Sequence, residues 1–333
     1  ATGLFGRERV GAERGQNWPR CRVSGGPWAV TRRFPASQAG SGGRSVKRKG
    51  FVVTGASRGI GLEVGLWCAR EGANSVIAAM SCSVDPRVEG TIHTAAAAIE
   101  KAGGQALAVK CDIRDEAQVE AAVAAAVDRF GGIDAVINNA SAIYPRPTAD
   151  VPMKRYDLMH QVNGRGTFLT TQKCLPYLMK AENPHIIALA PPLDMRGLWF
   201  GPHVAYTSAK YQMSLCILGW GEEFKGRIGA NAIWPRTAVA TAAISNVLAG
   251  EEAMKNCRKP EILADTAYAV LNKPAAEFTG NFLIDDSFLW DEGERDLDQY
   301  SYDPAIELLP DFFVPEEPAA PPGVKIMNVS LGH

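Results

Sequence analysis

The sequence has no long hydrophobic run, few histidines and no closely paired cysteines. None of its apolar stretches reaches the roughly 18 residues that a membrane-spanning helix needs. Its five histidines and seven cysteines are scattered singly, without a Cys-x-x-Cys pair or the spacing of a metal site. An odd, dispersed set of cysteines favours reduced thiols in an intracellular compartment over a disulfide framework. We therefore expect neither a transmembrane segment nor a bound metal ion.

Acidic residues are scarce at the N-terminus. Residues 1–50 carry nine Arg and two Lys against two Glu, although the formal net charge of the whole chain is -1. Residues 1–49 are rich in Gly, Arg, Ser and Pro and lack apolar periodicity, so they cannot bury enough surface to fold alone. They are interpreted as a disordered tail, an organellar targeting segment or an arm that grips a partner. A nucleic-acid role is not expected, because the segment has few aromatic residues and no binding motif.

From residue 50 onward, short apolar segments alternate with longer amphipathic ones. Strands are expected at residues 50–54, 74–80, 105–111, 133–138, 184–190, 228–234 and 282–284. Helices are expected at residues 60–71, 91–102, 116–130, 154–161, 164–179, 204–224, 238–248 and 260–271. Such alternation is typical of right-handed crossovers, which place helices on both faces of a parallel sheet. The prediction is one α/β domain at 50–302, a doubly wound parallel sheet of about seven strands, with extensions at 1–49 and 303–333.

The last segment, 303–333, contains too many prolines for a helix or a central strand. Four apolar side chains near its start favour contact with the domain or with a neighbouring molecule: Leu308, Leu309, Phe312 and Phe313. Beyond Pro315, a solvated tail is an equal alternative.

A glycine-rich turn, Thr-Gly-Ala-Ser-Arg-Gly-Ile-Gly (54–61), lies between the first strand and the first helix. Gly55 allows the tight turn, Gly59 lets the backbone approach a phosphate, and Gly61 lets the helix pack closely on the sheet. A pyrophosphate then lies on the free N–H groups and the positive dipole of the helix N-terminus. The turn therefore predicts dinucleotide binding through Gly55, Ser57, Arg58, Gly59, Ile60 and Gly61.

The second strand indicates which dinucleotide is bound. It ends Ala-Ala-Met-Ser-Cys (78–82), with no acid before Asp85 to accept a hydrogen bond from a ribose 2′-hydroxyl. Arg58 can instead pair with a 2′-phosphate, so we expect NADP in preference to NAD. The prediction of NADP would be stronger with a second basic residue at position 80, where this chain has Met80. Asp112 is placed to reach the adenine amino group; it is also placed to cap the helix that begins near Glu116, and the two roles are compatible.

These features resemble the short-chain dehydrogenase/reductase superfamily over about residues 50–287. Its motifs occur here in the family's order: Thr-Gly-x-x-x-Gly-x-Gly (54–61), Asn-Asn-Ala (138–140), Asn163 and Tyr-x-x-x-Lys (206–210). The chain is most similar to the hydroxysteroid dehydrogenase-like group, on motifs such as Gly-Thr-Ile-His-Thr-Ala (90–95), Asn-Ala-Ile-Trp-Pro (231–235) and Pro-Asp-Phe-Phe (310–313). The resemblance implies a Rossmann-type fold. The sterol-carrier domain of that group has no counterpart in these residues, so its activity is not expected.

The resemblance also implies a catalytic pair. In the family, the tyrosine protonates a carbonyl oxygen as hydride arrives from the nicotinamide. A free phenol has a pKa of about 10, so a nearby ammonium must lower it. The four-residue spacing places Lys210 one helical turn from Tyr206 on the same face. By resemblance, Lys210 also holds the nicotinamide ribose, and Asn163 holds a proton-relay water. Further cofactor contacts are implied at Asn139, Ala140, Pro235 and Thr237.

One expected residue is missing. The family places a carbonyl-holding serine at the end of the fifth strand, but residues 188–192 read Ala-Leu-Ala-Pro-Pro, with Ala190 at or beside the serine position. Losing one such donor typically costs about 10²–10³ in turnover. Thr237 and Ser141 are candidate substitutes. Arg236 is a second departure from the family's pattern, because the family usually has a glycine directly after the proline that stands here at Pro235.

Two hypotheses follow. The first is an NAD(P)-dependent oxidoreductase for a ketone, aldehyde or secondary alcohol, impaired by the lost serine. Its substrate would be lipid-like, given the apolar loop around Trp199 and Phe200. The second is a catalytically inactive accessory subunit of an organellar, for example mitochondrial, assembly that retains the nucleotide-binding fold. An organellar matrix location rests on the N-terminal composition alone. The family also implies a homo-oligomer through the helices at 164–179 and 204–224.

Overall fold

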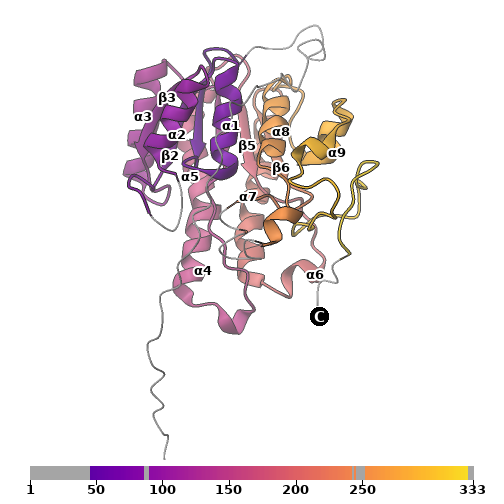
Figure 1. The fold of residues 1–333 in the computed structure, drawn as a ribbon. Helices are drawn as coiled ribbons and strands as arrows, with labels where there is room; N and C mark the ends of the chain where they lie inside the picture. The colour runs from indigo at the N-terminus through magenta and orange to yellow at the C-terminus, as the bar shows by residue number, and fades with distance from the viewer. Residues whose placement is uncertain (1–45, 86–89, 242–243, 245–251, 329–333) are drawn as a thin grey trace, which may run out of the picture. The chain divides into compact units, whose positions relative to one another are not determined.

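The computed structural model describes residues 46–85, 90–241, 244 and 252–328. Its centre is a parallel sheet of seven strands in the order β3-β2-β1-β4-β5-β6-β7 (Figure 1). The strands are β1 (Gly50–Thr54), β2 (Asn74–Ala79), β3 (Gln105–Lys110), β4 (Ala135–Asn138), β5 (His185–Leu189), β6 (Gly229–Trp234) and β7 (Phe282–Ile284). This is the predicted Rossmann-type sheet, doubly wound about the point where β1 and β4 pair.

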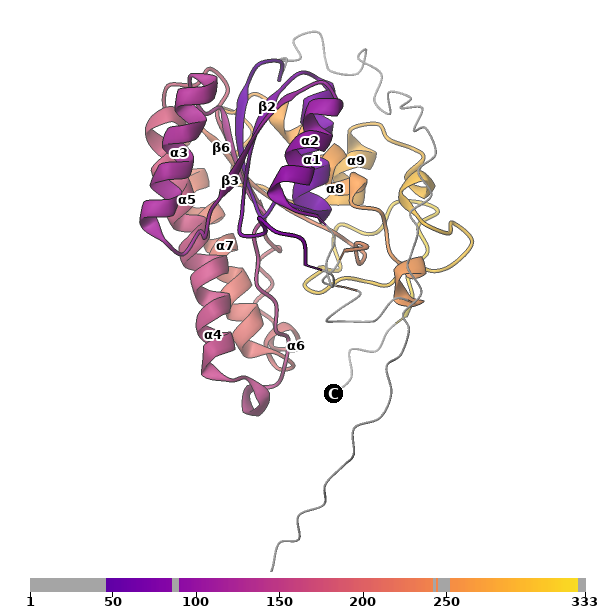
Figure 2. The ribbon, with the colours of Figure 1, turned by 60° about the vertical axis from the view of Figure 1, so that its left-hand side comes forward.

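Helices cover both faces of the sheet. They are α1 (Gly59–Arg70), α2 (Ile92–Lys101), α3 (Glu116–Phe130), α4 (Met153–Met159), α5 (Thr167–Leu178), α6 (Gly197–Phe200), α7 (Val204–Glu223), α8 (Glu261–Leu271) and α9 (Asp285–Asp291). One face carries α1, α2 and α8, and the other carries α3, α5 and α7 (Figure 2). Strands β1, β2, β4, β5 and β6 are buried along their whole length, which explains their continuous apolar sequences.

The two helices expected at 154–161 and 164–179 are joined without a loop. A π-helical segment, His160–Gly166, connects α4 directly to α5. Close packing requires its glycines: a Cβ on Gly164 would lie 1.8 Å from Oε1 of Gln212, and one on Gly166 would lie 2.5 Å from Ile113. π-Helical turns are rare and often occur at functional sites.

Some elements differ from the sequence prediction. Helices α6 and α9 were not predicted, because α6 has only four residues and α9 follows β7 without an intervening turn. Of the helix expected at 238–248, residues 238–240 are non-helical, and Val239 forms an isolated bridge with Arg258. Most of the remainder lies outside the described residues.

The described part of the C-terminal segment, 303–328, packs in the same compact unit as the sheet. Leu308 forms a parallel bridge with Ile326, and Phe313 is fully buried. Within the described residues, no helix is both long and apolar enough to cross a bilayer. The six cysteines of this part are free thiols. Residues 1–45, with their predicted roles, lie outside the described residues.

Candidate active site

The predicted site residues meet at the carboxyl ends of the central strands. The glycine turn follows β1, Asn139 and Ala140 follow β4, Ala190 follows β5, and Thr237 follows β6. Because parallel strands end at the same edge of a sheet, these loops lie together at the carboxyl edge, where a doubly wound fold is expected to have its ligand-binding cleft. Within the described residues, no group of three or more His, Cys, Asp or Glu side chains is arranged to hold a metal ion.

The glycine turn has the geometry of a phosphate cradle. Gly55 and Gly59 have φ angles of 67° and 56°, in the left-handed region that glycine tolerates. A Cβ on Gly61 would lie 2.5 Å from Nδ2 of Asn139 and 2.9 Å from Cα of Ala56. In contrast, the nearest atom to a Cβ on Gly59 is a methyl group of Thr241 at 3.5 Å. The backbone of Gly59 is therefore open to a ligand, whereas Gly55 and Gly61 shape the turn.

Asn139 fastens this turn to the neighbouring strand. Its Nδ2 donates to the carbonyl oxygens of Thr54 at 2.9 Å and Gly55 at 3.2 Å. In return, Oγ1 of Thr54 accepts hydrogen bonds from the backbone N–H groups of Asn139 and Ala140. The side chain of Asn139 therefore holds the glycine turn in place, and the backbone of that turn faces the cleft.

Arg58 lies where the adenosine ribose of a dinucleotide would be expected. Its Nη2 donates to Oγ of Ser81, just beyond β2, at 3.1 Å and to the carbonyl oxygen of Gly90 at 2.8 Å. The guanidinium is thus fixed at the end of β2, at the position discussed for the 2′-phosphate. Met80 beside it is half exposed.

Asp112 does not cap the following helix, so that predicted role was wrong. The N-cap of α3 is Asp115, whose side chain accepts from the N–H groups of Ala117 and Gln118. Asp112 instead binds the guanidinium of Arg114, with Nη2 to Oδ2 at 2.6 Å. These hydrogen bonds hold the pKa of the Asp112 carboxyl below its usual range. The N-cap is the residue directly before the first helical residue. Because α3 begins at Glu116, this residue is Asp115, and Asp112 lies three residues too early.

Tyr206 and Lys210 are buried on one face of α7. Lys210 Nζ donates to the carbonyl oxygen of Leu189 at 2.7 Å and lies 5.0 Å from the centre of the Trp234 ring. Burial lowers the pKa of Lys210 to about 7, against the opposing charge of Asp311. Burial, and to a lesser extent Asp311, raises the pKa of Tyr206. The lowering of the Tyr206 pKa that was expected from Lys210 is therefore not found, because burial outweighs it, and in this arrangement the phenol keeps its proton.

Asn163 lies in the π-helical segment and is fully buried. Its Oδ1 accepts from the backbone N–H of Ala142 at 2.7 Å, and its Nδ2 donates to the carbonyl oxygen of Ala142 at 3.0 Å. Both ends of the amide thus hold the loop after β4.

No hydroxyl replaces the missing serine directly at Ala190, which is fully buried. Ser141 is exposed at the surface. Thr237 is fully buried, and its Oγ1 has no hydrogen-bond partner among the described residues. Of the two candidate substitutes, Thr237 alone is buried beside Pro235 at the end of β6.

Arg236, the residue in place of glycine, is buried and serves a structural role. Its Nε donates to Oδ1 of Asp286 at 2.8 Å, and its backbone N–H donates to Oδ1 of Asp285 at 2.9 Å. Its Nη2 also donates to the carbonyl oxygens of Pro318 and Ala319. Burial and the neighbouring Asp286 raise the pKa of Asp285. Arg236 thereby ties the C-terminal segment to α9.

Residues 308–314, hereafter the C-terminal strap, contact the domain as one of the two alternatives predicted, but their place across the cleft was not predicted. Pro310 forms an antiparallel bridge with Thr237, and the N–H of Asp311 donates to the carbonyl oxygen of Arg236 at 3.0 Å. Trp234 Nε1 donates to the carbonyl oxygen of Phe312 at 2.7 Å. The apolar run 308–313 was the available signal, but nothing local to it identifies the partner.

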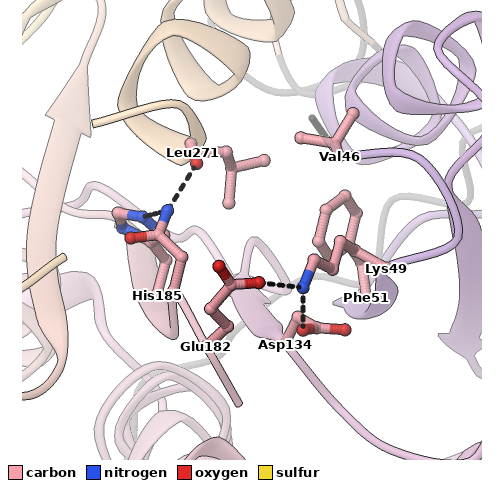
Figure 3. Close-up of a pocket in the computed structure, with 8 residues that line it drawn as sticks. Val46, Lys49, Phe51, Asp134, Glu182, His185 and Leu271 are labelled. Atoms are coloured by element: carbon pink, nitrogen blue, oxygen red, sulfur yellow. Dashed lines mark hydrogen bonds and ion pairs between the residues drawn. The ribbon is translucent and has the colours of Figure 1, made fainter. Parts of the chain in front are cut away.

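A separate pocket of about 230 Å³ lies at the opposite, amino-terminal edge of the sheet. Figure 3 shows Lys49 between Asp134 and Glu182, with both ion pairs at 3.4 Å. Its other lining residues are Val46, Phe51, Asn183, His185 and Leu271. This pocket contains none of the predicted site residues, so the candidate active site is the cleft at the carboxyl edge.

The chain belongs to the short-chain dehydrogenase family, whose model matches residues 49–251. A parallel sheet of this order, with the glycine turn and the Tyr206–Lys210 pair at its carboxyl edge, agrees with that assignment.

Among curated relatives, hydroxysteroid dehydrogenase-like protein 2 of Xenopus tropicalis is 54% identical over 270 residues, which is 81% of this chain and 64% of that protein. The chain thus spans less than two thirds of the relative's length. A solved short chain dehydrogenase from Mycobacterium thermoresistibile is 46% identical, with a TM-score of 0.78, covering 83% of this chain and 100% of that one. A solved NADH-dependent reductase complexed with NAD is 24% identical and has a TM-score of 0.58. The match covers 72% of this chain and 95% of that one, and it shows a shared fold.

Proposed function

We propose that the chain is an NADP-dependent oxidoreductase that acts on a ketone, an aldehyde or a secondary alcohol, with turnover reduced by the absence of a serine at Ala190. The observation that carries this proposal is the burial of Tyr206 and Lys210 on one face of α7, at the carboxyl edge of the sheet where the glycine turn also lies. A phenol and an ammonium one turn apart are a proton donor and the group that tunes it.

The residues of the cleft fit a nicotinamide dinucleotide. The backbone at Gly59 is open, as a pyrophosphate requires. The buried hydroxyl of Thr237 has no partner within the described residues and is available to a polar group of the ligand. Arg58 at the end of β2 favours a 2′-phosphate, and hence NADP over NAD. When bound, the cofactor supplies or accepts the hydride.

The chain's own residues handle the proton. In the reduction direction, Tyr206 holds a proton at its phenolic oxygen, which burial keeps in place, and donates it to the carbonyl oxygen of the substrate. The ammonium of Lys210 stabilises the phenolate that remains. Without a hydroxyl at Ala190, the carbonyl oxygen has one donor fewer, which typically costs about 10²–10³ in turnover.

The alternative is a catalytically inactive accessory subunit of an organellar assembly, for example a mitochondrial one. The specific observation in its favour is the absence of any hydroxyl at 188–192, with Ala190 sealed in the core. Exposed apolar side chains on α5 and α7, namely Phe168, Leu215 and Leu218, support association with another chain, a second copy included.

Turnover of a panel of ketones, aldehydes and alcohols with NADPH or NADP tests the two proposals. Under the first, Tyr206→Phe lowers kcat by about 10²–10⁴, because it removes the general acid. Tyr177→Phe, which removes a phenol on α5, is the matched control and leaves kcat unchanged. If the chain binds NADPH and turns over nothing on the panel, the oxidoreductase proposal fails and the accessory-subunit proposal stands.

A further inference from the structure

Phe313 is the most deeply enclosed residue of the C-terminal strap. It lies outside the expected domain limits of 50–302, yet its side chain is fully buried. Its ring lies 5.6–6.0 Å, centre to centre, from aromatic side chains of three elements and one cap position: Trp199, His203, Tyr206, Tyr211 and Trp234. These distances are typical of aromatic rings in contact. The ring of Phe313 therefore fills the space beside the proposed proton donor.

The backbone aims this ring into the cleft. Phe313 has a φ of 64°, a left-handed conformation that is uncommon for a bulky residue and persists only where the surrounding structure imposes it. The residues before it are fastened along their backbone: Ala238 donates to the carbonyl oxygen of Leu309, and Leu309 donates to that of Asn256, both at 2.8 Å. Phe313 itself is held by ring packing, so it can leave while the preceding backbone stays paired.

The space that Phe313 occupies is aromatic and offers few polar contacts. Trp199 Nε1 donates to Asp194, and the hydroxyl of Tyr211 donates to the Asp194 carbonyl oxygen. Trp234 Nε1 is taken by the strap, and Nδ1 of His203 is within 2.9 Å of the Thr207 hydroxyl. Because these polar ends already have partners, the walls present ring faces and edges.

A substrate cannot avoid this space. A carbonyl oxygen that accepts the proton of Tyr206 must approach its phenol, and the larger substituent of the carbonyl carbon then lies among the same rings. The ring of Phe313 lies 6.0 Å from that of Tyr206, centre to centre, so a bulky substituent beside the phenol meets this ring. A flat apolar group fits where a phenyl ring already does.

We propose that Phe313 is the specificity-determining residue of the cleft. Its ring occupies the subsite of the substrate, and the substrate is a carbonyl compound, or the corresponding alcohol, whose aromatic or similarly flat apolar group displaces that ring. This inference rests on the proposed oxidoreductase function, but its tests are read without turnover. The strap thereby selects against small carbonyl compounds, which cannot replace the contacts that Phe313 gives up.

Calorimetric titration with acetophenone, with ethylbenzene as the same ring without a carbonyl, tests the subsite. Phe313→Ala binds acetophenone at least about tenfold more tightly than the natural chain, because no ring has to be displaced. Adding Tyr206→Phe lowers the affinity for acetophenone about 2–10-fold, as expected for one lost hydrogen bond, and leaves that for ethylbenzene unchanged. Phe288→Ala, which empties a buried site on α9, is the matched control and shows no dependence on Tyr206.

A second measurement uses the natural chain and does not depend on the folding of a variant. Chymotrypsin cleaves after phenylalanine, and buried Phe313 is protected. Saturating acetophenone accelerates cleavage at 312–314, while acetone does not, and cleavage after the exposed Phe168 stays unchanged. The inference is overturned if acetophenone binds without accelerating this cleavage, or if loss of the Tyr206 hydroxyl affects both ligands equally. If the ring is displaced but no carbonyl compound is reduced, the inference stands and the oxidoreductase proposal fails.

Discussion

The two halves of the cleft are built in different ways. The cofactor half consists of two short motifs that the sequence alone identifies: the turn of residues 54–61 and the pair Asn139–Ala140, which hydrogen-bond directly to each other. The substrate half is assembled from α6, α7, the end of β6 and the C-terminal strap. Its central hydrogen bond joins Trp234 Nε1 to the backbone carbonyl oxygen of Phe312. The first half follows a pattern that local sequence encodes, and the second depends on contacts that no local pattern specifies.

The halves also differ in how far they depart from the family. The cofactor half keeps its glycines with left-handed or close-packed geometry at Gly55, Gly59 and Gly61. The substrate half has Ala190 for serine and Arg236 for glycine, and Arg236 is used to anchor the chain that covers it. We infer that cofactor binding is preserved while access and proton transfer are altered. Three measurements can break or sharpen this contrast.

The largest effect is expected at Ala190. If the substrate half lacks only one donor, Ala190→Ser raises kcat with NADPH and a reducible ketone by up to about 10²-fold, with little change in KM for the cofactor. Steady-state kinetics measures both. Ala188→Ser adds the same oxygen two residues earlier in the chain, within β5. It is the matched control and leaves kcat unchanged. An unchanged kcat in Ala190→Ser would mean that the substrate half has lost more of the family's catalytic machinery than this one hydroxyl.

The second effect belongs to the cofactor half. Arg58→Gln removes the charge fixed at the end of β2, so affinity for NADPH falls by about 1.5–3 kcal/mol, which is about 10–100-fold. Affinity for NADH, which lacks the 2′-phosphate, stays the same, as fluorescence titration of both cofactors would report. Arg70→Gln, in the last turn of α1, is the control for a lost surface charge. Equal losses for both cofactors would remove the argument for NADP.

The extent of the prediction from sequence follows the same division. Strands such as β1 and β7 were predicted at their observed limits, because continuous apolar runs bounded by turns encode buried parallel strands. The helix cap was assigned to Asp112 as one of two compatible roles, since two acids three residues apart both suit a cap, and the structure uses Asp115. The position of Phe313 could not be predicted, because no local pattern in 303–333 specifies which residues of α6, α7 and β6 its ring contacts.

The smallest effect is a pH dependence that joins the two halves through Lys210. Its pKa of about 7 means that the ammonium is lost as pH rises through neutrality, and Tyr206 then loses the charge that stabilises its phenolate. We expect kcat/KM for ketone reduction to fall above about pH 7, by at most about tenfold per pH unit. A pH–rate profile of the natural chain measures this.

Asp311 on the strap titrates in the same range, since burial raises its pKa to about 7 against the charge of Lys210. The variant Asp311→Asn separates the two groups. It removes a negative charge that favours the ammonium, so the pKa of Lys210 falls further and the decline in kcat/KM moves to lower pH. If Lys210 governs the profile, Lys210→Met gives low activity without this decline. A decline that stays in place in Asp311→Asn would mean that the strap does not influence the charge of the catalytic pair, and the two halves would then act independently.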